Sequence, residues 1–146
     1  MKNVKLMLLG LTGITAVHAQ DLTPDAVPQA VRASFQQTYT QATDVEWEQE
    51  YPGYSVAFEV DRMDHEIWYD KSGAILKSEQ ELTADELPQG VHDALLKAHK
   101  DFTIEEVEKL DIKGKITYTV ELEKGWFQER EVVVDATGKI LSDLED

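Results

Sequence analysis

Two stretches of the chain carry apolar or aromatic residues at every fourth position. These positions are Val27, Val31, Phe35 and Tyr39 in the first stretch and Leu87, Val91, Leu95 and His99 in the second. A spacing of four lines up side chains along one side of an α-helix. Proline is tolerated at the first helical position, where its missing N–H costs nothing, so the helices are expected to begin at or near Pro28 and Pro88. Thr23 and Thr83 are expected to cap a preceding helical turn.

After each predicted helix, the apolar period changes from near four to two. Alternation with polar residues occurs at Val45 and Trp47, at Tyr54, Val56, Phe58 and Val60, and at Ile116, Tyr118, Val120 and Leu122. This alternation is typical of antiparallel strands with one buried face. Turns are expected at Pro52–Gly53, Asp70–Gly73, Lys113–Gly114, Lys124–Gly125 and Asp135–Gly138. Each half of the chain is therefore predicted to contain one helix followed by four strands.

The two halves also resemble each other in sequence. Residues 22–31 match residues 82–91 at an offset of 60, residues 54–60 match 116–122 at 62, and residues 66–76 match 131–141 at 65. The offset grows only where turns are expected, which places the insertions in loops. We predict an α+β fold, a tandem duplication of a helix plus four-stranded antiparallel meander unit. The repeats are expected to cover residues 20–81 and 82–146, with both helices on one face of the sheet.

Helices on one face leave the other face of the sheet uncovered. Counting by strand parity, we expect this face to carry Trp68, Phe127, Glu59, Glu121, Glu66 and Glu129. A face that mixes aromatic side chains with carboxylates suits protein recognition, in which aromatic anchors supply much of the binding energy. The alternatives are a solvated face or a face covered by a loop or a second subunit.

Residues 1–19 have the three-part pattern of a secretory signal peptide. Lys2 and Lys5 precede an uncharged run from Leu6 to Val17, and small residues at Val17 and Ala19 suit a cleavage site. The run of 12 residues is too short for a membrane span, which needs about 20. We therefore predict cleavage after Ala19, export to the periplasm or beyond, and no membrane span in the cleaved chain.

Composition narrows the partners and the chemistry. The chain has 29 acidic and 14 basic residues, a net charge of −15, and after cleavage 12 basic and 29 acidic residues would leave −17. Such an excess repels phosphate backbones and anionic lipids, so nucleic acid is not an expected partner. The absence of cysteine excludes disulfides, thiolate metal sites and cysteine nucleophiles.

Motifs for catalysis or cofactor binding are missing from the sequence. It contains no serine nucleophile elbow and no glycine-rich phosphate loop, so we expect no catalytic residue, no cofactor and no enzymatic activity. A hydrolase that uses two of the many carboxylates remains an alternative.

A short acidic segment suggests a further alternative. Asp61, Asp64, His65 and Glu66 fall within six residues at an expected hairpin tip. Carboxylates suit hard cations and imidazole suits transition metals, but the spacing matches no calcium loop. A cation-binding acidic periplasmic protein is therefore the alternative function.

Three features of the sequence are repeated or paired. They are the Leu-Thr-x-Asp-x-x-Pro-x-x-Val opening, the alternating strand pairs, and the Asp-x-x-Gly-x-Ile turns at Asp70–Ile75 and Asp135–Ile140. In these features the chain resembles the β-lactamase-inhibitor-like, PepSY-like family of small exported bacterial proteins. The resemblance covers about Leu22 to Leu144. It implies a Gram-negative periplasmic or secreted protein with helices on an antiparallel sheet, similar to inhibitors that lay a concave sheet over β-lactamase. Those inhibitors use disulfides, which this chain lacks, and no catalytic residues carry over.

Together these observations predict an exported, non-enzymatic binding or inhibitory module of the bacterial envelope. Its partner is expected to be a protein, in keeping with the suspected role of PepSY domains in restraining peptidases. The open sheet face is the expected contact surface.

Overall fold

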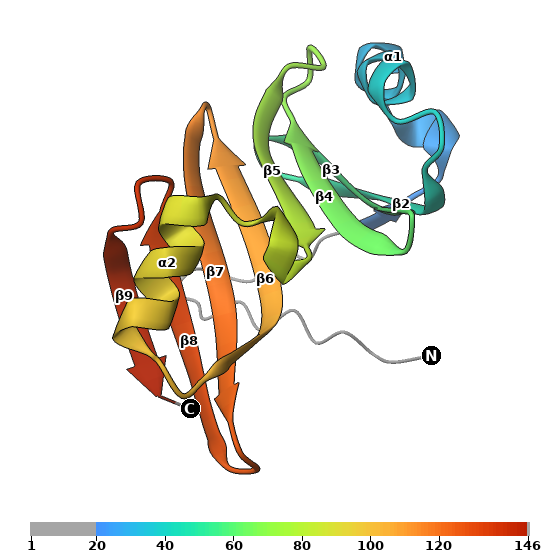
Figure 1. The fold of residues 1–146 in the computed structure, drawn as a ribbon. Helices are drawn as coiled ribbons and strands as arrows, with labels where there is room; N and C mark the ends of the chain where they lie inside the picture. Colours follow the sequence, from blue (N-terminus) through green and yellow to red (C-terminus); the bar gives the residue numbers. More distant parts are fainter. Residues whose placement is uncertain (1–19, 146) are drawn as a thin grey trace.

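The strands of the protein follow their order in the chain across one antiparallel sheet. The structure, a computed structural model, describes residues 20–145, and in this range the sheet has nine strands in the order β1 to β9 (Figure 1). Two α-helices in the same described range pack on the sheet. The predicted α+β class and antiparallel sheet are confirmed. The predicted signal peptide, residues 1–19, lies outside the described residues.

The element order is similar in the two halves of the chain. The first half contains β1 (Gln20–Leu22), a 3-10 turn η1 (Pro24–Ala26), α1 (Gln29–Thr38), β2 (Thr43–Glu50), β3 (Gly53–Val60), β4 (Met63–Tyr69) and β5 (Ile75–Leu82). The second half contains η2 (Ala84–Glu86), α2 (Gln89–Ala98), β6 (Thr103–Ile112), β7 (Lys115–Lys124), β8 (Gln128–Asp135) and β9 (Ile140–Glu145). Each α-helix is thus followed by four strands, and the short β1 pairs with β2.

The helices begin where the prolines predict. Pro28 and Pro88 directly precede α1 and α2, and each proline carbonyl accepts hydrogen bonds from the first turn of its helix. Thr83 caps the 3-10 turn η2, as its spacing from Glu86 predicts. The Glu86 carboxylate accepts hydrogen bonds from the N–H of Thr83 at 2.8 Å and from its hydroxyl at 2.9 Å. A missing proline N–H costs nothing at this position, and the fixed φ of proline suits the helix start.

Each helix covers its own hydrophobic core. The first core contains Val27, Val31, Phe35, Trp47, Val56, Phe58, Ile67 and Tyr69. The second contains Leu87, Val91, Leu95, Val107, Tyr118, Val120, Leu122, Val132 and Val134. In both cores the helix side with the four-residue spacing packs on the alternating positions of the following strands, as the sequence predicts.

The two halves share one sheet because β5 pairs with β6. The ladder contains five residue pairs and brings Leu82 opposite Val107, a member of the second core. On β5, Ser78 lies opposite Ile67, a member of the first core. Directly opposed residues of antiparallel strands project to the same face, and Ser78 and Leu82 are an even number of residues apart. Both helices therefore lie on the same side of the sheet.

Two details differ from the simple alternation. Val45 was expected on the buried side with Trp47, but the register of β2 shifts between Thr43 and Glu46, and Val45 is 38 % exposed. A bulge of this kind adds one residue and breaks the period of two. In the second half, strand parity was expected to include Phe127, but β7 ends at Lys124 and residues 125–127 form the turn to β8.

Candidate functional site

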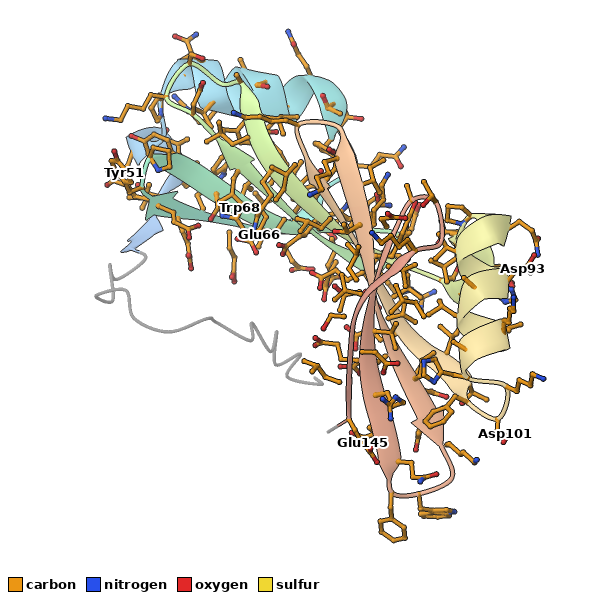
Figure 2. All side chains as sticks on the ribbon, turned by 90° about the vertical axis from the view of Figure 1, so that its left-hand side faces the viewer. Tyr51, Glu66, Trp68, Asp93, Asp101 and Glu145 are labelled. Carbon is orange, nitrogen blue, oxygen red and sulfur yellow. The ribbon has the colours of Figure 1, made fainter. Side chains whose placement is uncertain are left out.

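The face of the sheet opposite α1 and α2, called the open face below, carries many carboxylates. Register places Glu59, Glu66 and Trp68 on it in the first half and Glu121 and Glu131 in the second. Figure 2 shows the sheet as strongly bent, with the helices on the outer side and the labelled Glu66 and Trp68 on the inner side. No helix covers this inner side within residues 20–145.

Trp68 on β4 is held in place by side chains from β5 and β2. The Lys77 ammonium lies 3.5 Å from the centroid of the indole ring, and the indole N–H donates a hydrogen bond to Glu50 at 2.5 Å. Lys77 also forms an ion pair with Glu79 at 2.8 Å. A cation over an indole face contributes about 0.5–2 kcal/mol, depending on how far it is removed from water. These contacts hold the ring in one orientation.

Two carboxyl groups on the open face, those of Glu66 and Glu108, have raised pKa values. Burial raises the pKa of Glu66 to about 7, and the charge of Glu79, its cross-strand neighbour, acts in the same direction. Burial also raises the pKa of Glu108, and Glu79 adds to that effect through its charge and a hydrogen bond. Removal from water and nearby like charge both disfavour the ionised form of a carboxyl group. The negative charge of the open face consequently increases as pH rises through neutrality.

We expect Glu66→Gln to stabilise the protein at pH 8 but not at pH 4.5. The pKa of Glu66 is higher in the folded protein, about 7, than the ordinary value of 4.5. Its stabilising contribution is therefore complete below pH 4.5 and lost as pH rises through 7. Gln cannot ionise, so the variant should gain about 1–2 kcal/mol above pH 7, a figure reduced for partial exposure. Urea unfolding at both pH values measures this difference.

Glu46→Gln is the matched control for this experiment, since it removes one exposed carboxylate from the same face. An equal gain for Glu66→Gln at pH 4.5 and pH 8 would contradict the assigned cause, because simple removal of one negative charge would then explain it.

The predicted contact residues do not form one cluster. Glu59, Glu66 and Trp68 lie together on β3 and β4, whereas Glu121 lies on β7, beyond β5 and β6. Glu129 lies near the start of β8, opposite Glu123. The sixth, Phe127, lies in the β7–β8 turn rather than in a strand and is 93 % exposed.

Trp126, next to Phe127 in the same turn, is 90 % exposed and was not predicted as a contact residue. The sequence contains a signal for it, because the offset between the two halves rises from 62 to 65 between residues 122 and 131. Those three extra residues enlarge the hairpin that carries both aromatic side chains.

The predicted cation ligands do not converge. Asp64 and Glu66 project to the open face, but His65 projects to the helix side, where its ring stacks on Phe58 with centroids 5.1 Å apart. Burial in this position lowers the pKa of His65. Across residues 20–145, no three histidine, aspartate or glutamate side chains are grouped so that they could hold a metal ion. Strand pleat is the reason, since consecutive residues of a strand point to opposite faces.

A shallow hollow lies at the base of the β7–β8 hairpin. It has a volume of about 180 Å³ and is lined by Glu105, Glu121, Leu122, Glu123, Glu129 and Arg130. This volume is below the roughly 300–1,000 Å³ of small-molecule sites. The Arg130 guanidinium forms ion pairs with Asp143 at 2.7 Å and Glu145 at 3.4 Å. The hollow is thus strongly acidic, and its arginine is already engaged.

A family model described as "putative beta-lactamase-inhibitor-like, PepSY-like" matches residues 14–77 and 52–142. No curated protein matches the chain. No helix within the described part of the chain is long and apolar enough to cross a membrane.

Several solved structures have the same fold at low sequence identity. A protein of Bacteroides eggerthii, described as one of the "putative periplasmic proteins", is 17 % identical with a TM-score of 0.66, over 82 % of this chain and 88 % of the other. A DUF2874 family protein of Bacteroides uniformis is 20 % identical with a TM-score of 0.65, over 81 % and 88 %. A BLIP-like protein of Bacteroides fragilis is 24 % identical with a TM-score of 0.62, over 81 % and 86 %.

Proposed function

The chain belongs to the beta-lactamase-inhibitor-like, PepSY-like family, and from that premise we propose that it is a non-enzymatic module that binds a protein in the bacterial envelope. The observation that carries the proposal is Trp68 on the open face, fixed between Lys77 and Glu50. An aromatic side chain that is already ordered loses little entropy on binding and can serve as an anchor. The carboxylates around it favour a partner surface with basic side chains.

The site of action that we propose is the periplasm, or outside the cell, after cleavage behind Ala19. The description of the B. eggerthii protein as periplasmic supports this location. The description of the family as beta-lactamase-inhibitor-like supports an inhibitory form of binding, and we propose a peptidase or another enzyme as the partner. The proposal assigns no catalytic residue and no cofactor to the chain.

We also infer that residues 20–81 and 82–146 are two PepSY-like repeats of one ancestral unit. The family model matches the chain twice, at residues 14–77 and 52–142, which supports a duplication. The repeated order of 3-10 turn, α-helix and four strands supports it as well.

The proposed contact through the open face can be tested with envelope extract from the source bacterium. The immobilised chain should retain a partner protein, and Trp68→Ala should reduce its recovery at least about tenfold, the usual cost of removing an aromatic anchor. Trp68→Phe keeps a ring and should retain part of the binding. Quantitative mass spectrometry of the retained proteins gives the measurement, and the melting temperature checks that each variant is folded.

Gln36→Ala is the control for this test, because Gln36 is exposed on α1, away from the open face. Equal recovery of the same proteins by Trp68→Ala and Gln36→Ala would rule out the open face as the contact surface.

A further inference from the structure

The β7–β8 hairpin carries two adjacent aromatic side chains that point into solvent. Trp126 is 90 % and Phe127 is 93 % exposed, although such side chains bury large areas in most proteins. Figure 1 shows this hairpin extending beyond the neighbouring strands and beyond α2. Adjacent exposed aromatics at a projecting tip mark an interaction site rather than a folding requirement.

The equivalent hairpin of the first half shows that the fold does not need these aromatics. There, β3 and β4 are joined through Asp61 and Arg62, which have φ values of 52° and 68°. This two-residue polar turn joins the strands that are equivalent to β7 and β8. The second half has three more residues in this region, as the change of offset from 62 to 65 shows. The aromatic tip is therefore an addition to the shared unit.

The base of the hairpin is acidic. Glu123 lies directly opposite Glu129, and like charges in this arrangement repel each other. Both also line the acidic hollow described above. The nearby cations are engaged, since Arg130 pairs with Asp143 and Lys124 pairs with Asp101 at 3.2 Å. A surface that approaches the tip closely must therefore bring positive charge to the carboxylates behind it.

We propose that Trp126 and Phe127 enter an apolar pocket of a partner protein, and that lysine or arginine side chains on the pocket rim meet Glu123 and Glu129. The inference rests on the proposed function, because the tip anchors the same partner that the open face contacts. Charge complementarity selects this occupant. An anionic membrane would repel the carboxylates at the hairpin base, and a second copy of the chain would bring acidic surfaces together.

Amine-substituted β-cyclodextrin is a suitable chemical probe, because it has an apolar cavity with an ammonium rim. Binding to the full chain is followed by isothermal titration calorimetry, which does not depend on the Trp126 side chain that the double variant lacks. We expect tighter binding than to sulfated β-cyclodextrin, weakening with added salt. The double variant Trp126→Ala/Phe127→Ala should bind at least about tenfold more weakly than the unaltered chain. Tyr51→Ala, which removes another aromatic side chain, 89 % exposed in the β2–β3 turn, is the matched control and should leave binding unchanged.

Three outcomes with the purified chain would overturn the proposal. Equal binding of the sulfated and amine-substituted probes would exclude selection by rim charge. Binding to vesicles of phosphatidylcholine and phosphatidylglycerol, lost in the double variant, would assign the tip to a membrane. Dimerisation seen by sedimentation, and lost in the double variant, would assign it to a second copy.

Photo-cross-linking in envelope extract separates this inference from the proposed function. Benzoylphenylalanine is placed at position 127 in one sample and at position 68 in another. We expect both to label one protein, with the label from position 127 in an apolar pocket that has lysine or arginine at its rim. Labelling from position 68 alone would overturn the inference about the tip and leave the open face standing. Labelling from position 127 alone would support the tip and remove the open face from the interface.

Discussion

Replacement of Gly138 by alanine is expected to lower the free energy of unfolding by about 3 kcal/mol. Gly138 has a φ of +89°, and an added Cβ would lie 2.6 Å from the backbone oxygen of Gly90 in α2. The left-handed backbone costs an L-residue roughly 1–2 kcal/mol, and the forced shift of the helix adds about 1–3 kcal/mol. Thermal unfolding followed by circular dichroism should show a melting temperature lower by roughly 10 °C.

Gly114→Ala is the matched control for this variant. Gly114 has a φ of +86°, but an added Cβ would meet no atom within 4 Å. Only the backbone contribution of roughly 1–2 kcal/mol should then appear. Equal destabilisation by the two substitutions would show that the close approach between the β8–β9 turn and α2 does not matter for stability.

The same contact occurs in the first half of the protein. Gly73 has a φ of +87°, and an added Cβ would lie 2.6 Å from the backbone oxygen of Ala30 in α1. In both turns an aspartate accepts hydrogen bonds from the following residues, and these bonds lower the pKa of Asp70 and of Asp135. The Asp-x-x-Gly motif that marks the repeat in the sequence is therefore the point at which each turn touches its helix.

Replacement of Phe35 by alanine should have a still larger effect, about 4 kcal/mol. Phe35 is buried in the first core, where its ring lies 5.3 Å from Trp47 and 5.0 Å from Phe58, both edge-on. The substitution removes these aromatic contacts, each about 0.5–1.5 kcal/mol, and leaves a cavity beneath α1. Urea unfolding monitored by tryptophan fluorescence measures the loss.

Leu95→Ala gives the comparison in the second core. Leu95 is the counterpart of Phe35 on α2 and is also buried, but its core is mainly aliphatic. A smaller loss of about 3 kcal/mol is expected there. If Phe35→Ala cost no more than an exposed substitution such as Gln36→Ala, below about 0.5 kcal/mol, the described packing of α1 would be wrong.

Periodicity and internal repetition were enough to predict the α+β class, the antiparallel sheet, both helices and the covered face, but not the short strand β1. The four-residue spacing of Val31 and Phe35 and the two-residue spacing of Val56 and Phe58 reflect burial directly, so they survive in the sequence. Parity along a strand likewise placed Glu66 and Trp68 on the open face.

The immediate surroundings of Trp68 required the structure. Lys77 reaches the indole ring from β5, and Glu50 reaches it from β2. Parity within one strand says nothing about the register between strands, so it could not predict which side chains meet. The raised pKa of Glu66 also required the structure, because burial is its main cause and the charge of Glu79 across the β4–β5 pair adds to it.

The site predictions weakened where the strand pattern stops. Parity counting does not extend through a turn of unknown length, so Phe127 was assigned to the face rather than to the tip, and Trp126 was missed. The acidic segment from Asp61 to Glu66 illustrates the opposite problem. Its members are close in sequence, but the pleat directs His65 away from Asp64.

The β5–β6 ladder also protects the protein against aggregation. Unpaired strand edges are templates for pairing with other chains, and two separate halves would expose β5 and β6, strands of eight and ten residues, as further edges. In the joined sheet the outer strands are β1, which has three residues, and β9, which carries Asp143 and Glu145. Short and charged edges resist such pairing. The junction that extends the open face thus leaves the sheet with edges that are poor seeds for polymerisation.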